Sequence, residues 1–344
     1  MEENLRKAEE NMLKTTTKVI NNAQRKGNYP KQFSMPLGVQ YELTYDCNLK
    51  CKHCYNASGE KGQNTRMKVD DWVNLSKQLT NNGGIFQCII SGGEPLLLGK
   101  DLFRIMDILH KDDVSFVFIT NGYLLTEELV NQLKKYRYYR FQVSIDSSNQ
   151  NEHDEFRQKK GSWKRAVRGA YFASKAGLPL AIASSVTPQN LNNMEEMAEL
   201  AYQIGASSLI FGKIMLSGRA AENKEFILNK EQVEEMDKNI IELRKKYNNR
   251  MSIEHSTTEI YQLKKSQSTP TDTVIVRPNG NVRLDCSAPF VIGNVLSNSF
   301  LDIWKNKASN CWKHPKIKEY IQSINEDTGE SSMLTNHVDK DIYI

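Results

Sequence analysis

The chain reads Cys47-Asn48-Leu49-Lys50-Cys51-Lys52-His53-Cys54 directly after a strand-like run at residues 39–44. Three thiolates on one short loop can each bind one iron of a four-iron cluster, which leaves the fourth iron without a protein ligand. An open metal position is where chemistry takes place, whereas a closed site usually has a structural role. The C-x3-C-x2-C spacing therefore indicates a reactive metal site on a loop that follows a strand.

A glycine motif follows the next strand-like run, residues 85–90, where the chain reads Ser91-Gly92-Gly93-Glu94-Pro95. Glycine has no Cβ, so its backbone can approach a ligand closely and can adopt a positive φ. The cysteine spacing and this glycine motif together resemble the radical S-adenosylmethionine (radical SAM) superfamily.

Strand-like and helical runs alternate from residue 39 onward, and six strand–helix units can be counted. Such alternation predicts an α/β fold, which we expect to be a partial (β/α)6 TIM-like barrel with a small α+β C-terminal extension. Folds of this kind carry their chemistry at the carboxyl ends of the strands. The cysteine loop, the glycine motif, Asn121 and Ser144 all lie there or one residue short of it. The expected strands are 39–44, 85–91, 114–120, 140–145, 178–186 and 208–211, and the expected helices are 70–79, 102–109, 163–176, 194–204, 230–247 and one capped by Thr126.

The sequence divides into four expected regions. Residues 1–35 look like an N-terminal helical extension, and residues 36–250 form the barrel. Residues 251–322 form the C-terminal domain, in which Asn279-Gly280 should turn a hairpin within 274–284. Residues 323–344 are expected to be a polar tail that frays from about residue 327.

The resemblance implies that Cys47, Cys51 and Cys54 hold a [4Fe-4S] cluster and that S-adenosyl-L-methionine binds its open iron. It also implies a cofactor-binding set. Arg157 would pair with the methionine carboxylate, a task that suits its forked guanidinium. Ser147 stands where the strand-four motif of the family has glycine. A zinc site with His53 or a distant cysteine as fourth ligand is the structural alternative. The expected cofactor-binding residues are His53, Gly92, Gly93, Glu94, Asn121, Ser144, Arg157 and Leu216.

The C-terminal region resembles the SPASM or shorter twitch domain of radical SAM peptide maturases, through 276–280, Cys286, 293–295 and 300–304. That pattern usually carries about seven cysteines for auxiliary clusters, whereas only Cys286 and Cys311 remain here. A degenerate domain without metal is expected. A site made by Cys286, Cys311 and His314 is conceivable, and Cys286 is a weak candidate for a hydrogen-atom donor. Cys88 lies in an apolar strand and should be a core residue.

Composition narrows the class of protein further. A net charge of +5 without an aromatic–basic module gives no support for nucleic-acid binding. No run approaches the roughly 18 apolar residues of a membrane span, and the charged start is unlike a secretory signal. A cytoplasmic protein with free thiols is expected. Basic patches at 134–137 and 159–165 would suit an acidic flavodoxin or ferredoxin donor or an acidic peptide, although solvated surface is the simpler interpretation.

The expected activity is abstraction of hydrogen from an unactivated carbon by a 5′-deoxyadenosyl radical. The SPASM-like region points to a ribosomally made peptide, modified by a thioether, a carbon–carbon crosslink or epimerisation. A radical SAM oxidoreductase of a small-molecule or cofactor pathway is the alternative enzyme, and a non-catalytic zinc or scaffold protein is the alternative from another class. Since no extra leader-binding domain is apparent, a separate leader-binding partner is expected.

Overall fold

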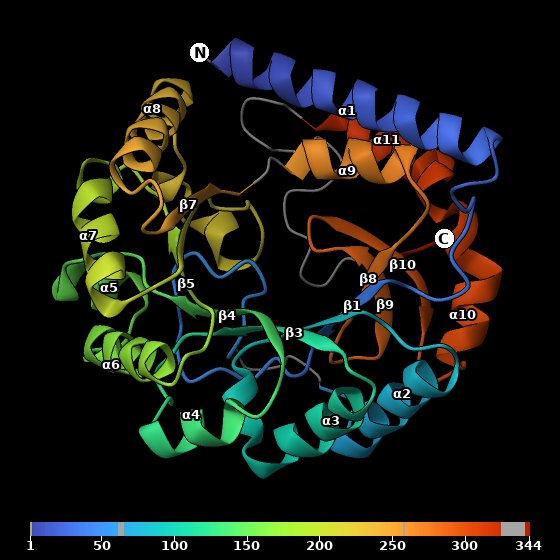
Figure 1. Ribbon diagram of the computed structural model, residues 1–344, viewed down its shortest axis with the longest axis horizontal. Coiled ribbons are helices and arrows are strands. Elements are labelled where there is room, and N and C mark those ends of the chain that lie inside the picture. Colours follow the sequence, from blue (N-terminus) through green and yellow to red (C-terminus); the bar gives the residue numbers. More distant parts are fainter. Residues whose placement is uncertain (1, 61–64, 257–258, 325–340) are drawn as a thin grey trace.

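The computed structural model describes residues 2–60, 65–256, 259–324 and 341–344. Its helices and strands alternate over the first two thirds of the chain, and smaller elements follow (Figure 1). The helices are α1 (Glu2–Arg25), α2 (Val69–Asn81), α3 (Lys100–Lys111), α4 (Glu127–Leu133), α5 (Gln150–Phe156), α6 (Ser162–Lys175), α7 (Met194–Ile204), α8 (Lys230–Lys246), α9 (Glu259–Ser268), α10 (Phe300–Lys307) and α11 (Pro315–Ser323). The strands are β1 (Gly38–Glu42), β2 (Gln87–Ser91), β3 (Ser115–Thr120), β4 (Tyr138–Ser144), β5 (Leu180–Ser185), β6 (Ser208–Gly212), β7 (Ser252–His255), β8 (Thr273–Val276), β9 (Asn281–Asp285), β10 (Ala288–Asn294) and β11 (Ile342–Tyr343).

All strands of the described residues form one sheet, in the order β11-β10-β9-β8-β1-β2-β3-β4-β5-β6-β7. Strands β1 to β7 pair in parallel, each with the next along the chain. The predicted α/β fold with a partial barrel is therefore confirmed. The run from β1 to β7 has one strand more than the six predicted, and β8 pairs in parallel with β1 on its other side. Because every parallel strand runs the same way, the loops that follow them meet at one edge.

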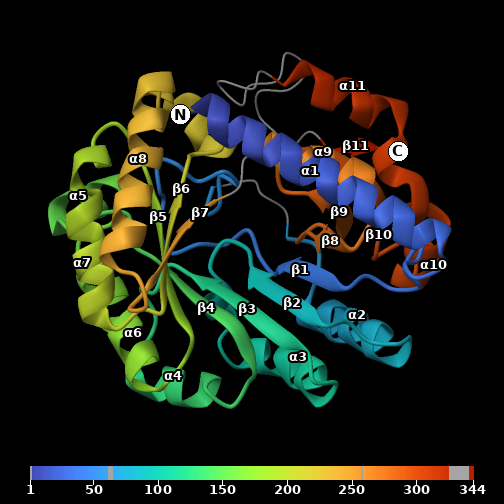
Figure 2. The ribbon, with the colours of Figure 1, turned by 45° about the horizontal axis from the view of Figure 1, so that its top comes forward.

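The helices cover the outer face of the curved sheet, as Figure 2 shows. Large side chains that are fully buried fill the space between helices and strands, and they include Trp72 of α2 with Phe116 and Phe118 of β3. Strand β3 alternates half-buried and buried residues, as expected for a strand with one face on the core. Helix α1 packs beside α9 and contacts α8, so the N-terminal extension lies along the barrel rather than apart from it.

Helix ends follow the local signals of the sequence. The side chain of Thr126 accepts a hydrogen bond from Leu129 N at 3.2 Å and caps α4, as predicted. Gly205 ends α7 in the left-handed conformation at φ 87°, where a side chain would be strained. Asn149 caps the short α5, which the sequence did not indicate.

The C-terminal strands extend the sheet on the far side of β1. Strand β8 pairs in parallel with β1 and antiparallel with β9, so the hairpin predicted at Asn279-Gly280 is confirmed. The expectation of a frayed end is wrong for residues 341–344, since β11 pairs with β10 and Ile344 N donates to Val291 O. Residues 325–340 of that predicted tail lie outside the described residues.

Candidate functional site

The cysteine loop follows β1 and is fixed from several sides. Lys52 N donates to Phe156 O at 2.9 Å, which ties the loop to the end of α5. The guanidinium of Arg219 donates to Cys51 O at 2.7 Å and to Ser58 O at 3.0 Å, while Arg219 N donates to Cys54 O at 3.0 Å. Backbone carbonyls that would otherwise need water thus have partners inside the protein. These hydrogen bonds hold the loop from within the protein.

The glycine motif packs backbone against backbone on the segment that leads into Cys47. Gly93 N donates to Thr44 O, and Glu94 N donates to Asp46 O at 2.9 Å. A Cβ on Gly93 would lie 2.0 Å from Asp46 O, and Gly92 has φ 141° with Thr44 O 2.8 Å from its ideal Cβ position. The two glycines are therefore required by this close approach, independently of any ligand.

Glu94 connects the glycine motif to the end of β3. Its carboxylate is fully buried and accepts hydrogen bonds from Thr120 Oγ1 at 2.8 Å and from Asn121 N at 2.9 Å. Burial raises the pKa of Glu94 to about 7, although these hydrogen bonds act in the opposite direction. Asn121 in turn donates to Asn48 Oδ1 at 2.8 Å and lies 3.8 Å from Cys47 Sγ. The carboxyl ends of β2 and β3 thus meet the cysteine loop, as the strand-end argument predicts.

The thiols fit an iron–sulfur cluster by their chemistry. Burial, together with the neighbouring Cys54, raises the pKa of Cys47 to about 11 and that of Cys51 to about 12. A buried thiolate needs a positive charge beside it, which iron supplies. Within the described residues, the Nδ2 atom of Asn48 and the Nδ1 atom of His53 are buried without a hydrogen-bond partner, and both belong to this loop.

Asp146 binds Arg157 beside the cysteine loop. Arg157 Nε donates to Asp146 Oδ2 at 2.7 Å, and both side chains are almost completely buried. Burial acts to raise the pKa of Asp146, but the charge and hydrogen bond of Arg157 together with the effects of His53 and His153 outweigh it and hold that pKa well below its usual range. The guanidinium also acts electrostatically on Cys51 and Cys47.

His53 lies on the same side and stacks on Phe156, with ring centroids 4.1 Å apart and planes 7° from parallel. Its Nε2 is 3.8 Å from Asp146 Oδ2. Burial lowers the pKa of His53 to about 4, against the effect of Asp146, so the imidazole is neutral at pH 7. Its ring presents a flat, neutral face inside the site.

The remaining predicted residues lie at neighbouring strand ends. Ser144 is the last residue of β4 and is half-buried, and Leu216 is half-buried in the loop after β6. In the described ranges no three His, Cys, Asp or Glu side chains gather as ligands of a single metal ion. A four-iron cubane cluster does not need three side chains gathered around one metal ion, because each thiolate binds a separate iron.

The conceivable auxiliary site is not assembled among the described residues. Cys311 is buried, with its Sγ 3.1 Å from Ala308 O and 3.3 Å from Thr271 Oγ1. The imidazole of His314 caps α11 by accepting from Lys316 N. Cys286 is half-buried beside Asp285 and acts electrostatically on Tyr55, the residue after Cys54. Cys88 is fully buried in β2, as predicted.

Three residues of the site were missed by the sequence analysis as functional candidates. Asp146 lies between Ser144 and Ser147 of the strand-four motif, and its spacing from Arg157 was the available signal. Phe156 precedes Arg157 and had no signal of its own. Arg219 lies 168 positions after Cys51, and nothing in the local sequence connects the two.

Comparisons with known proteins agree with this geometry. The model of the radical SAM superfamily matches residues 41–201, and that of the SPASM iron–sulfur cluster-binding domain matches residues 268–325. The chain is 31% identical over 192 residues to the antilisterial bacteriocin subtilosin biosynthesis protein AlbA of Bacillus subtilis, covering 56% of this chain and 42% of AlbA. It is 33% identical over 190 residues to the AdoMet-dependent heme synthase of Methanosarcina barkeri, covering 55% and 54%. The chain thus spans about half the length of these curated relatives.

A solved structure shares the fold. Streptococcus suis SuiB bound to the precursor peptide SuiA matches with a TM-score of 0.67 at 14% identity, over 92% of this chain and 78% of SuiB. Among the described residues, none of the helices is both long and apolar enough to cross a membrane.

Proposed function

We propose that this chain, which belongs to the radical SAM superfamily and carries a SPASM-type domain, is an enzyme that modifies a ribosomally made peptide. The observation that carries the proposal is the thiol loop, held at the carboxyl edge of the sheet by Arg219 and the glycine motif. The peptide substrate is supported by the similarity to AlbA, a bacteriocin biosynthesis protein, and to SuiB, solved with a precursor peptide.

Cys47, Cys51 and Cys54 would hold a [4Fe-4S] cluster. When bound, that cluster supplies the electron that cleaves S-adenosylmethionine to methionine and a 5′-deoxyadenosyl radical, which takes hydrogen from an unactivated carbon. The protein contributes placement and an enclosure from which water is excluded. Cys51 is buried, and Cys47 and Cys54 are half-buried, so the thiols lie partly shielded from solvent.

The residues around the loop would bind and orient S-adenosylmethionine. Arg157 is held by Asp146 through Nε, and its fork suits a carboxylate such as that of methionine. Gly92 and Gly93 are half-buried at the same edge, and the ring of His53 offers an apolar face. Glu94, Asn121, Ser144 and Leu216 complete the proposed binding set from the ends of β2, β3, β4 and β6.

The proposed modification is a thioether, a carbon–carbon crosslink or an inverted stereocentre. A low-potential donor is required, because iron–sulfur potentials range down to about −700 mV. We propose a flavodoxin or ferredoxin for this role, and a separate leader-binding protein for recognition of the precursor. We propose that the chain divides into residues 1–35, 36–250, 251–322 and 323–344. Strand β11 joins residues 341–344 to the C-terminal domain.

A cofactor-pathway oxidoreductase is the second candidate, favoured by the identity to the heme synthase. Co-expression with a short peptide encoded beside this chain, followed by mass spectrometry, separates the two. A mass change of the peptide supports the maturase, whereas an unmodified peptide beside an active radical enzyme supports the second candidate.

The chemistry itself is tested by reconstituting the chain with iron and sulfide under anaerobic conditions. We expect a brown protein with the Mössbauer spectrum of a four-iron cluster, which releases 5′-deoxyadenosine from S-adenosylmethionine after reduction. Cys51→Ala should abolish this release, and Cys88→Ala, a matched loss of a buried thiol outside the loop, should retain it. A colourless protein that binds one zinc would contradict the proposal and indicate a scaffold.

A further inference from the structure

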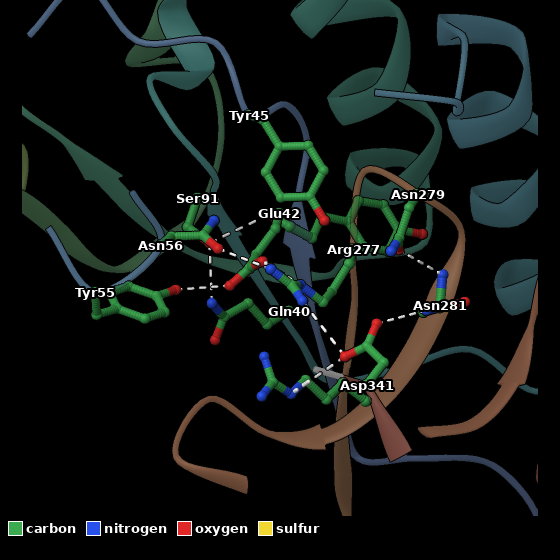
Figure 3. Close-up of polar contacts among 12 residues, drawn as sticks. Gln40, Glu42, Tyr45, Tyr55, Asn56, Ser91, Arg277, Asn279, Asn281 and Asp341 are labelled. Atoms are coloured by element: carbon green, nitrogen blue, oxygen red, sulfur yellow. Dashed lines mark hydrogen bonds and ion pairs between the residues drawn. The ribbon is translucent and has the colours of Figure 1, made fainter. Parts of the chain in front are cut away.

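Two arginines are buried where the C-terminal strands meet the barrel (Figure 3). Arg277 follows β8 and is 1% exposed, and Arg283 of β9 is 3% exposed. Arg277 Nε lies 3.3 Å from Glu42 Oε2, and its Nη2 donates to Asn56 Oδ1 at 2.8 Å. Glu42 also accepts from Tyr55 OH at 2.6 Å, so this cluster touches the two residues that follow Cys54.

Asp341 supplies the second carboxylate of the cluster. Its Oδ1 lies 3.5 Å from Arg277 Nη1 and 3.9 Å from Arg283 Nε, and its Oδ2 accepts from Asn281 Nδ2 at 2.6 Å. The carboxylates that act on both guanidiniums are those of Glu42 and Asp341. Two guanidiniums buried together are costly in the interior, and the carboxylates of Glu42 and Asp341 offset that cost. Asp341 therefore contributes to this cluster through its negative charge.

The segment that brings this carboxylate is short and lies at the sheet edge. Ile342 and Tyr343 pair in parallel with Phe290 and Val291, a contact much shorter than a usual strand of five or six residues. Tyr343 OH donates to Asn281 Oδ1 at 2.7 Å, so positions 341 and 343 both contact the amide of Asn281. Residues two apart on a strand face the same side of the sheet. When a peptide adds a strand to a sheet edge, its alternate side chains therefore determine specificity.

We propose that the edge of β10, together with Arg277, Asn281 and Arg283, is a docking site for an extended acidic peptide. Residues 341–344 occupy that site in cis and compete with the peptide. Main-chain pairing with β10 supplies affinity, while the arginines and Asn281 select an acidic residue followed two positions later by a hydroxyl-bearing ring. The proposal that this site binds substrate rests on the proposed peptide modification. The contacts of Arg277 with Asn56 and Glu42 place the site beside the cysteine loop.

The test measures binding of a fluorescein-labelled peptide with the sequence of residues 338–344 to the full chain. Asp341→Asn weakens the segment bound in cis, so the labelled peptide should bind that variant about tenfold more tightly than wild type, as expected for one charge-assisted hydrogen bond. Asp113→Asn, an exposed aspartate elsewhere, should bind as wild type does. A labelled peptide with Asn at the position of Asp341 should bind the Asp341→Asn chain about tenfold more weakly.

Amide hydrogen exchange provides a measurement that needs no variant. The Ile344 N–H, bonded to Val291 O, should exchange by local opening, faster than the amides of β9, and excess unlabelled peptide should speed it further. The proposal is overturned if the two peptides bind alike, if Asp341→Asn binds no more tightly than wild type or does not fold, or if Ile344 exchanges only with global unfolding. Neither readout involves S-adenosylmethionine cleavage, so a failure of the proposed chemistry remains distinguishable.

Discussion

Replacing Asp146 by Asn should destabilise the apo chain by about 3–5 kcal/mol. Asp146 is 3% exposed and Arg157 is 5% exposed, and they are joined by a hydrogen bond of 2.7 Å. Removal of one partner of a buried pair leaves the other charge uncompensated in the interior, which accounts for that cost. Asp146 Oδ1 also accepts from Ser185 N at 3.0 Å, and an amide oxygen can keep this bond. The expected loss therefore comes from the charge.

Equilibrium urea unfolding of wild type and variants at pH 7.5 measures this cost. The matched control is Asp70→Asn, which breaks the exposed pair between Asp70 and Arg104, whose side chains are 76% and 53% exposed. Exposed pairs contribute about 0–1 kcal/mol, so the control should change stability little. The double variant Asp146→Asn with Arg157→Met removes both charges and should recover at least about 2 kcal/mol relative to Asp146→Asn.

Equal losses for Asp146→Asn and Asp70→Asn would refute the reasoning, because burial would then have no effect on the pair. A double variant no more stable than Asp146→Asn would refute it as well, since the loss would then arise from packing. Affinity for S-adenosylmethionine tests whether Asp146 orients Arg157, separately from its effect on the stability of the fold. If Asp146 orients Arg157, the folded fraction of Asp146→Asn should bind it more weakly than the Asp70→Asn control.

Two further predictions concern the same edge of the sheet. Gly93→Ala should cost about 1–3 kcal/mol and lower the iron bound on reconstitution, because the new Cβ would meet Asp46 O at 2.0 Å. Gly38→Ala, whose Cβ would find its nearest atoms at 3.4 Å, is the control, and equal losses would contradict the steric argument. His153 should stabilise the apo chain above pH 6.5 and lose this contribution as the pH falls toward 4, because burial lowers its pKa to about 4 whereas an unfolded histidine titrates near 6.5. The stability difference between wild type and His153→Gln should therefore shrink from pH 7.5 to 4.5, a comparison that cancels the opposite slope from Glu94, whose raised pKa favours the folded state at low pH. A difference that stays constant would show that His153 does not titrate in this way.

Local patterns predicted most of the parallel sheet. The run 114–120 is mostly apolar and forms β3 over Ser115–Thr120, and Thr126 caps α4 as its side chain suggests. Helix α5 was missed because its seven residues, Gln150–Phe156, are mostly polar and show no apolar stripe. Strand β11 was missed for another reason, since two residues paired across the sheet leave no periodic signal.

The site could be predicted only where its residues are close in sequence. Cys47, Cys51 and Cys54 share one loop, and the glycine motif ends the following strand, so strand order alone brings them together. Asp146 and Arg157 lie eleven positions apart, and the sequence indicated only Arg157 as a site residue. Arg219 could not be found, because its role depends on the path of the chain after β6 and on backbone carbonyls, which carry no sequence signature.

The cysteine loop is held from both ends of the parallel sheet, and this gives the C-terminal domain a role that needs no metal. Arg219, after β6, binds Cys51 O and Ser58 O, whereas Arg277, after β8, binds Asn56 Oδ1 from the opposite side. Loss of either guanidinium would remove hydrogen bonds that hold this loop, at a cost of about 1–3 kcal/mol each. A domain with only Cys286 and Cys311 can therefore support the chemistry of the barrel by ordering the loop that would bind its cluster.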